Sequence, residues 1–217
     1  MAIDWGVYVS ALPILWEGTI ATLEISFCAI ILGTLGGLVL GILSLSAWGP
    51  ARAFVRGYVD FIRGTPLLVQ IFLVFFALPV VGISLNETWS GIAALSLNCA
   101  GYVSEIVRGT VSGVEEGQSD AAKAIGMTRI QTIVYILVPQ AIRPMLPAMT
   151  NELISLIKNS SLLSVIAVYE LMNAAKGIIA TDFVPFQIYT LVAIFYFIMV
   201  SLVASLSRYV ERRLPAW

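Results

Sequence analysis

The chain has 217 residues, of which 59% are hydrophobic and 12% are charged, and its net charge is −1. Soluble domains carry about a quarter charged residues, so this composition excludes an ordinary soluble protein and predicts an all-α integral membrane protein. The weak net charge excludes nucleic acid as a partner, and the absence of histidine excludes histidine-based catalysis and histidine metal ligands.

Residues 1–17 are expected to form an extracytoplasmic lead rather than a signal peptide. They contain Asp4 and Glu17 but no lysine or arginine, whereas a signal peptide begins with a basic region. The first hydrophobic segment should therefore remain in the protein.

The first span is predicted at about residues 19–45, and it carries a regular row of glycines. Gly33, Gly37 and Gly41 recur every four residues, with Gly36 beside them. This spacing leaves one face of a helix almost without side chains, so another helix can approach it closely. The sequence does not decide whether that partner is another span or another subunit.

Two further spans are predicted at about residues 54–80 and 89–107. The segment Arg63-Gly64-Thr65-Pro66 is either a cytoplasmic anchor with a helix start or a functional site, and both interpretations stay open. At the end of the third span, Glu105 and Arg108 are three residues apart and should form an ion pair within the helix.

The most polar run of the chain, residues 117–131, predicts a short helix at 119–126 followed by a second helix. Ser119 is a suitable N-cap, Asp120 complements the dipole of the first turn, and Gly126 ends the helix. Thr128 and Gln131 have the spacing of a capping box that opens the next helix. The face between the caps is small and mildly apolar, which predicts insertion into a partner; it consists of Ala121, Ala122, Ala124 and Ile125.

The fourth span is predicted at about residues 139–162 as an interrupted span. Pro139, Pro144 and Pro147 should break its start, and the polar run 158–161 should interrupt its later part. The fifth span is predicted at about residues 186–207, and residues 212–217 should form a cytoplasmic tail.

The distribution of basic residues predicts the orientation. Residues 46–64, 108–143 and 208–213 contain ten lysines and arginines, whereas the segments on the other side contain only Lys158 and Lys176. Because basic residues concentrate on the cytoplasmic side, we expect five transmembrane helices with the N-terminus outside and the C-terminus inside. This places the helix at 119–126 in the cytoplasm, where a soluble partner can dock.

Ionisable residues at membrane depth usually face a polar path or a partner, which makes the fourth region a candidate substrate path. Its members are Glu152, Lys158, Asn159, Ser160 and Ser161, for which a structural hydrogen-bond cluster is an equally good interpretation. Glu170 is a second candidate, because it could meet a substrate ammonium group or pair with Lys158.

No catalytic residue, metal site or bound cofactor is expected in this chain. Cys28 and Cys99 both lie in apolar runs, which favours buried side chains over a disulfide or a metal pair. The sequence contains no Gly-x-x-x-x-Gly-Lys-Ser/Thr phosphate loop, so no nucleotide site of that type is expected in this chain. The absence of a nucleophile motif disfavours a membrane enzyme.

The run Ser119-Asp-Ala-Ala-Lys-Ala-Ile-Gly126-Met, followed by Ile136-Leu-Val-Pro139-Gln-Ala, resembles the EAA loop of permease subunits in binding-protein-dependent ABC importers. Asp120 stands where the motif has glutamate, which keeps the carboxylate. Residues 58–72, 97–109 and 155–166 are similar to signatures of the polar amino-acid permeases for histidine, glutamine, glutamate and arginine. The resemblance covers about residues 18–211 and implies a type I ABC importer transmembrane domain.

This resemblance implies a subunit that moves polar L-amino acids into a prokaryotic cell across its plasma (inner) membrane. It implies two copies of an ABC ATPase subunit that bind ATP and Mg²⁺, a second permease subunit, identical or homologous, and an extracytoplasmic amino-acid-binding protein. A coupling helix would dock into the ATPase through Asp120, Ala121, Ala122, Ile125 and Gly126. The sequence leaves open which amino acid is carried.

An ion-coupled secondary amino-acid transporter is the alternative interpretation, since an interrupted span with Glu152 fits it loosely. Such transporters commonly contain inverted repeats with paired broken helices, and five spans do not divide into equal halves. Transport that needs only this chain and an ion gradient would distinguish this alternative.

Overall fold

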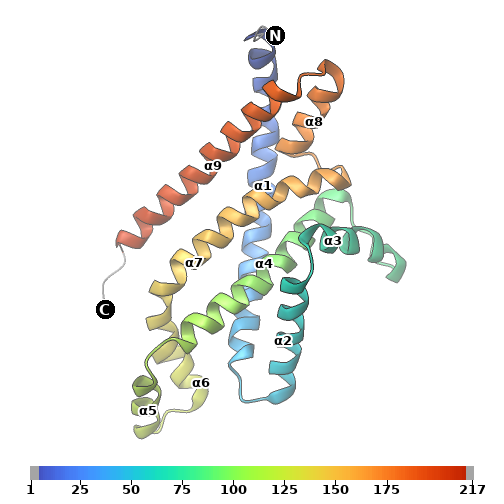
Figure 1. The fold of residues 1–217 in the computed structure, drawn as a ribbon. Coiled ribbons are helices and arrows are strands. Elements are labelled where there is room, and N and C mark those ends of the chain that lie inside the picture. The colour runs from blue at the N-terminus through green and yellow to red at the C-terminus, as the bar shows by residue number, and fades with distance from the viewer. Residues whose placement is uncertain (1–4, 214–217) are drawn as a thin grey trace.

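The structure, a computed structural model, describes residues 5–213, and every regular element in that range is a helix (Figure 1). The all-α fold class predicted from the sequence is confirmed for the described range. Residues 1–4 of the predicted lead and residues 214–217 of the predicted tail lie outside it. The long helices are α1 (Trp5–Ser44), α4 (Glu87–Ser112), α7 (Val138–Asn159) and α9 (Pro185–Arg213).

Three helical stretches of the described chain are long and apolar enough to cross a membrane, namely residues 6–44, 129–166 and 185–213. A fourth arises if α2 (Gly49–Gly64) and the segment 67–81, which bend by 110° at their junction, count as one broken span. That segment consists of α3 (Leu67–Phe72), η1 (Leu73–Ala77) and η2 (Pro79–Val81).

The third span predicted from the sequence corresponds to α4, the central helix of the bundle. It is 26 residues long and buries the polar side chains of Ser90, Asn98 and Ser104. These side chains face protein, because α1, α2, α3 and α7 all pack against α4. A helix surrounded in this way needs less apolar surface than one that faces lipid.

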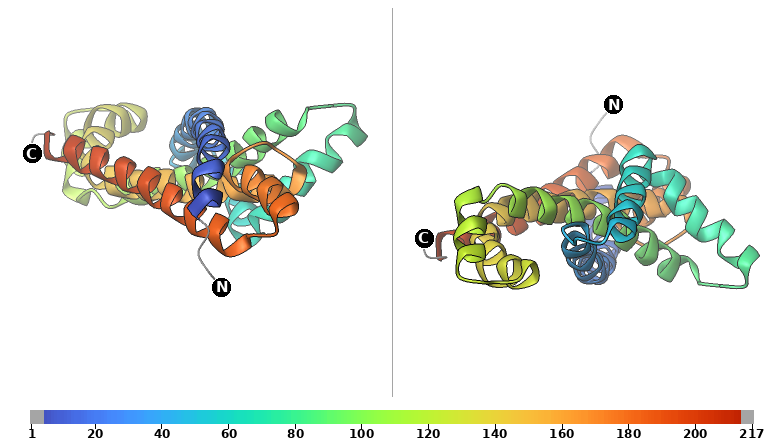
Figure 2. Two further views of the ribbon diagram at one scale, coloured as in Figure 1. Left: turned by 90° about the horizontal axis from the view of Figure 1, so that it is seen from above. Right: turned by 90° about the horizontal axis from the view of Figure 1, so that it is seen from below.

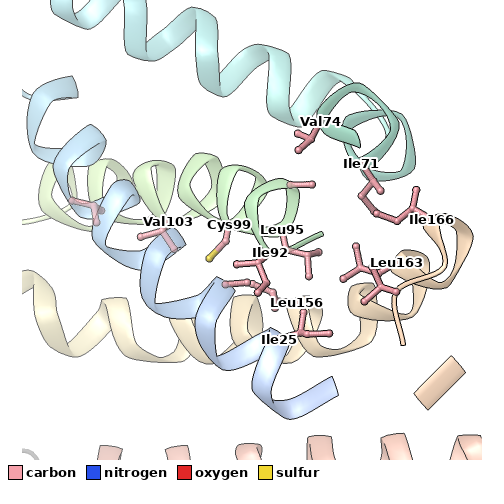
Figure 3. Packing of buried hydrophobic residues seen from close by; sticks show 14 of the residues in the cluster. Ile25, Ile71, Val74, Ile92, Leu95, Cys99, Val103, Leu156, Leu163 and Ile166 are labelled. Carbon is pink, nitrogen blue, oxygen red and sulfur yellow. The ribbon is translucent and has the colours of Figure 1, made fainter. Parts of the chain in front are cut away.

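The glycine row of α1 packs against α4, so its partner is another helix of the same chain. A Cβ atom at Gly33 would lie 2.6 Å from Cys99 Cβ, and one at Gly37 would lie 2.5 Å from Val103 Cβ. Gly41 repeats this arrangement one turn further along. Figure 3 shows Cys99 and Val103 beside the α1 ribbon where the two helices cross. These positions require glycine because two helix backbones meet there.

Buried apolar side chains form two clusters that α1 connects. The larger lies where α1, α4 and α7 meet the broken span and the 3₁₀ segment η4 (Ser160–Ile166), and Figure 3 labels members from Ile25 to Ile166. The smaller cluster joins the first turns of α1 to α8 (Leu171–Asp182) and α9. The helices α8 and α9 thus form a unit that packs on the N-terminal part of α1.

A buried polar network holds the break between α2 and α3. Pro66 has no N–H and occupies the cap of α3, so carbonyl groups at the end of α2 lose their helical partners. The Gln70 amide donates to the carbonyl oxygens of Ile62 (2.8 Å) and Thr65 (3.1 Å), and it accepts a hydrogen bond from Asn98 Nδ2 (2.9 Å). These bonds replace the ones that water would supply outside a membrane.

The prolines of the fourth region do not break its helix, contrary to the prediction from the sequence. The elements α6 (Arg129–Gln131), η3 (Thr132–Leu137) and α7 follow one another directly, and Pro144 and Pro147 lie inside α7. The π-helical turns of η3 immediately precede Pro139 and shift the hydrogen-bond register where its ring would otherwise clash. The regular helix changes only at Ser160, where η4 begins.

Gly37→Val should destabilise the protein, because the new side chain would need space that Val103 fills. Overpacking of this kind costs roughly 1–3 kcal/mol. We expect a lower midpoint of thermal unfolding for the purified protein in detergent. Gly57→Ala is the matched control: its Cβ would meet nothing within 4 Å, and alanine favours a helix, so the midpoint should hold or rise. Equal midpoints for the two variants would contradict the close α1–α4 packing.

Candidate functional site

A compact loop joins α4 to η3 at the end of the molecule opposite to the N-terminus and α8 (Figure 1). It consists of α5 (Glu116–Ala124), a tight turn and α6, and it projects away from the segment that follows α2 (Figure 2). The short helix predicted at 119–126 is present but begins three residues earlier. Ser119 therefore lies inside the helix, and its predicted role as N-cap is wrong. The acidic Glu116 accounts for the early start, since it complements the helix dipole in the first turn.

Hydrogen bonds fix the turn between α5 and α6, as the sequence predicts. Gly126 adopts φ 81°, and its N–H donates to Lys123 O (2.9 Å) while the Met127 N–H donates to Ala122 O (3.0 Å). This is a Schellman-type C-cap, which needs a left-handed residue. A Cβ at Gly126 would meet nothing within 4 Å, so backbone conformation rather than crowding favours glycine here. Both bonds of the capping box predicted for α6 are also present.

Two of the five residues predicted to dock into a partner have side chains that are engaged within this chain. Ala122 is only 3% exposed and holds α5 against the rest of the loop. Asp120 forms an ion pair with Lys123 (2.9 Å) and lies at the wall of a cleft of about 620 Å³ between α5, the end of α4 and η3. The pair is exposed and adds little stability, so the Asp120 carboxylate stays accessible to a partner.

The outer surface of the loop is apolar. Ile125 is 77% exposed, and Ile130, on the α6 side of the turn, is 75% exposed. We refer to Ile125, Gly126 and Ile130 as the α5–α6 tip. Ala121, which lies in α5, is also exposed. Sequence reasoning missed Ile130, although a large apolar side chain in the first turn of a capped helix within a polar run is a usable signal. An exposed apolar tip of this kind suits an interaction surface.

The candidate path residues of α7 do not form a single cluster. Glu152 is half-buried, whereas Lys158 is exposed. Glu152 and Asn159 share a face because they are two turns apart, and Lys158 lies roughly 120° around the helix from Glu152. The structure therefore brings Glu152 and Asn159 to one side and separates them from Lys158.

The serines at the end of α7 make local hydrogen bonds. Ser160 is buried and donates to Ile157 O (2.8 Å), and Ser161 donates to Lys158 O (2.8 Å). These bonds satisfy carbonyl groups where the α-helix changes into η4. The geometry of the two hydroxyls favours the structural interpretation of this part of the cluster.

Glu170 is an enclosed structural carboxylate. It is 0% exposed and caps α8 by accepting hydrogen bonds from the N–H groups of Met172 (2.9 Å) and Asn173 (2.7 Å). It accepts a third from the Tyr196 hydroxyl of α9 (3.2 Å). Burial raises the pKa of the Glu170 carboxyl, and these hydrogen bonds partly offset that rise. Its predicted contact with a substrate ammonium group or with Lys158 is wrong, because its own chain surrounds the carboxylate.

Polar contacts beside Glu170 connect α8 to its neighbours. The Thr22 hydroxyl of α1 accepts the Leu171 N–H (3.1 Å), and Lys176 Nζ donates to Ser164 Oγ of η4 (2.8 Å). With Glu170 and Tyr196 these residues form a polar seam between the two apolar clusters. Sequence reasoning missed Thr22 and Tyr196, which carry no signal beyond being polar residues in apolar spans.

Glu170→Ala should lower stability by roughly 1–3 kcal/mol, because three part-buried donors lose their acceptor. Thermal unfolding of the purified protein measures this loss. Glu170→Gln keeps one acceptor oxygen and should give an intermediate midpoint. Asp182→Ala is the control, since Asp182 is exposed at the other end of α8. If Glu170→Ala were as stable as Asp182→Ala, the capping role would be refuted.

Relatives match this sequence along its whole length. Residues 33–215 match the family described as "Binding-protein-dependent transport system inner membrane component". The chain is 36% identical over 224 aligned residues to the glutamine transport system permease protein GlnP of Escherichia coli strain K12, with 99% of each chain covered. It is 33% identical over 217 residues to the arginine transport system permease protein ArtQ of Bacillus subtilis strain 168, covering 100% of this chain and 99% of the relative.

Solved structures share the fold. A chain in the crystal structure of an amino acid ABC transporter with histidines superposes with a TM-score of 0.91 at 36% identity, covering 99% of this chain and 100% of that chain. A chain of the inward-facing methionine transporter MetNI gives a TM-score of 0.80 at 21% identity, over 94% of this chain and 97% of that chain, and supports the fold alone. The predicted fold of a type I ABC importer transmembrane domain and the resemblance to amino-acid permeases are thereby confirmed. The chain belongs to the family of binding-protein-dependent transport system inner membrane components.

Proposed function

We propose that this chain is the permease subunit of an ABC importer that moves polar L-amino acids into the cell, with ATP hydrolysed on a separate subunit. The observation that carries the proposal is the exposed α5–α6 tip, held by its caps at the end of a bundle of membrane helices. Relatives named for glutamine and arginine transport support the substrate class.

The proposed topology has five membrane crossings, with the N-terminus outside and the C-terminus inside. The crossings are α1, the broken α2–α3 span, α4, the stretch from α6 to η4, and α9. Ten of the twelve lysines and arginines then lie towards the cytoplasmic end of the bundle, as the α5–α6 tip does, which agrees with the usual bias. In this arrangement the protein is a multi-pass component of a prokaryotic inner membrane, with residues 18–211 as its transporting domain.

The proposed assembly contains four kinds of partner. Two ABC ATPase subunits bind ATP and Mg²⁺ on the cytoplasmic side, and no cofactor binds to this chain. A second permease subunit, identical or homologous, completes the membrane pair, and an extracytoplasmic binding protein delivers the amino acid. Lipid covers the remaining apolar surface, since large side chains such as Phe27, Leu35 and Phe197 are exposed on α1 and α9.

Docking at the α5–α6 tip would transmit movement to α4 and α7. Buried Ala122 fixes α5 within the loop, and a turn of only three residues separates the end of α4 from the start of α5. In turn, α4 packs on α1 through the glycine row and on α2 through Gly101, where a Cβ would lie 2.7 Å from Ile62. A displacement of the tip therefore reaches the bundle through short, packed connections rather than through a flexible linker.

We place the substrate path beside α7, on the face that carries Glu152 and Asn159. A half-buried carboxylate can bind the ammonium group of an amino acid, and an amide can bind its carboxylate. Lys158 is exposed and points to a different side of α7, so it suits the entrance of this path rather than direct contact with the amino acid beside Glu152 and Asn159. Ser160 and Ser161 belong to its framework, since their hydroxyls bond to the chain itself.

Ile125→Asp should uncouple transport from ATP hydrolysis, because it places a charge where the ATPase would receive an apolar side chain. Amino-acid uptake and substrate-stimulated ATPase activity of the reconstituted complex should fall at least about tenfold. Gly126→Asp should have the same effect, with added strain from a non-glycine residue at φ 81°. Ile125→Asp should still insert and keep its thermal midpoint, since Ile125 packs against little of its own chain.

Gln118→Glu is the control for these variants, because it adds a negative charge at an exposed position of α5 outside the tip. Normal uptake and normal ATPase stimulation in both tip variants would refute the docking role. Uptake by this chain alone in liposomes, driven by an ion gradient, would support a secondary transporter instead.

A further inference from the structure

A charged cleft of about 280 Å³ lies between α2, α4 and the end of α1, below the break in the second span. Its charged lining comes from one face of α2 and the adjoining part of α4, and consists of Arg52, Arg56, Asp60, Arg63, Glu105 and Arg108. Four guanidinium groups and two carboxylates therefore share one small space. The excess of positive charge favours an anion there.

The depth of this cleft argues against lipid around its charges. The helix α2 runs antiparallel beside α1 (Figure 1), so its charged face extends from the end of α1 into the bundle. Arg63 is near the far end of this 16-residue helix, roughly 20 Å above its start at 1.5 Å per residue. Charged side chains at such a depth face a polar path or a partner, because hydrocarbon cannot solvate them.

The two exposed flanks of α2 have different chemistry. Arg52, Arg56 and Arg63 follow one stripe, while Phe54 and Phe61 are exposed on the far side of the helix. The aromatic flank suits lipid or a neighbouring helix, and the arginine flank suits water. This division is typical of a helix that borders a water-filled path.

Two of the six charged groups have no side-chain partner among the residues that the structure describes. Glu105 accepts hydrogen bonds from Arg108 Nε (3.1 Å) and from a terminal nitrogen of the same guanidinium, and Arg63 lies 4.0 Å from this carboxylate. Within residues 5–213, the side chains of Arg56 and Asp60 make no hydrogen bond and no ion pair. Arg56 and Asp60 lie one turn apart on the cleft side of α2. A positive and a negative side chain are therefore adjacent and available to bind a ligand.

We propose that this cleft is an exit site for the transported amino acid, in which Arg56 binds the α-carboxylate and Asp60 binds the α-ammonium group. The inference rests on the proposed function, which makes the end of α1 and the start of α2 cytoplasmic. Arginine binds carboxylates through paired N–H···O bonds, and a carboxylate complements an ammonium group. All amino acids carry both groups, so the site serves substrates with different side chains. Its open, hydrated setting favours release over tight binding.

Thiol labelling tests this site independently of transport. Arg52→Cys serves as the reporter in the cleft, and Phe54→Cys reports the opposite flank. Both are placed in a Cys28→Ser, Cys99→Ser background of the complete transporter, which removes the two native cysteines. A membrane-impermeant thiol reagent applied from the cytoplasmic face should modify the Arg52→Cys variant at least about tenfold faster than the Phe54→Cys variant.

Protection of the reporter cysteine from labelling shows which ligand occupies the cleft. A mixture of the common L-amino acids on the cytoplasmic face should slow labelling of the Arg52→Cys variant by about threefold or more, and Arg56→Gln should abolish this protection. Arg208→Gln is the matched control and should keep it, because Arg208 is exposed at the far end of α9.

Three results would overturn the proposal. Equal labelling at the two reporters would show that the cleft is not a water-filled path. Protection that survives Arg56→Gln would exclude Arg56 as the carboxylate ligand. Protection by phosphatidylglycerol in the bilayer, but not by amino acids, would assign the cleft to a lipid headgroup. Failure of the wild-type complex to import any amino acid is scored separately by uptake and would contradict the proposed function instead.

Discussion

The contact between α1 and α4 at Gly33, Gly37 and Gly41 determines how the rest of the bundle is arranged. A Cβ atom at any of these positions would come within 2.6 Å of a facing side-chain atom, so the two backbones approach as closely as glycine permits. This contact holds α4 at the centre, where its other faces receive α7 and the broken α2–α3 span. Because α4 leads almost directly into α5, one tightly packed helix connects the membrane bundle with the exposed tip.

Buried polar groups have distinct roles at different levels of the bundle. Gln70 donates to the carbonyl groups that the break at Pro66 exposes, and Asn98 donates to the side-chain oxygen of Gln70, so the two side chains together preserve the bend of the second span. Glu170 closes the N-terminus of α8 and ties it to α9, so that α8 cannot move without its neighbour. The side chains of Gln70, Asn98 and Glu170 all form hydrogen bonds within the chain. Among the described residues, Arg56 and Asp60 of the α2–α4 cleft make no hydrogen bond or ion pair through their side chains, and this cleft is where we place the exit site.

Sequence spacing predicted the features that are decided within one or two turns. The Gly126 helix stop, the capping box of α6 and the Glu105–Arg108 pair depend only on neighbours along the chain, and all three are present. Apart from the N-cap assigned to Ser119, which the earlier start of α5 at Glu116 displaced, the errors arose where tertiary contacts or helix register decide the outcome. The π-helical turns of η3 accommodate Pro139, and the folding of α8 onto α9 encloses Glu170. Neither could be inferred from composition, because both depend on groups that are distant along the chain or on a register change without a residue signature.

The central claim is that the α5–α6 tip contacts an ATPase subunit, and site-specific cross-linking tests it most directly. Ile125→Cys and Ile130→Cys, in a background without the two native cysteines, would be labelled with a short thiol-reactive reagent that carries a photoactivatable group, and the assembled transporter would then be illuminated. Val80→Cys is the comparison, because Val80 is 84% exposed but lies on η2, in the segment that projects away from the tip. The account predicts a cross-link from either tip position to the ATPase subunit and none from Val80→Cys. Cross-linking from neither tip position, or equally from all three, would contradict it.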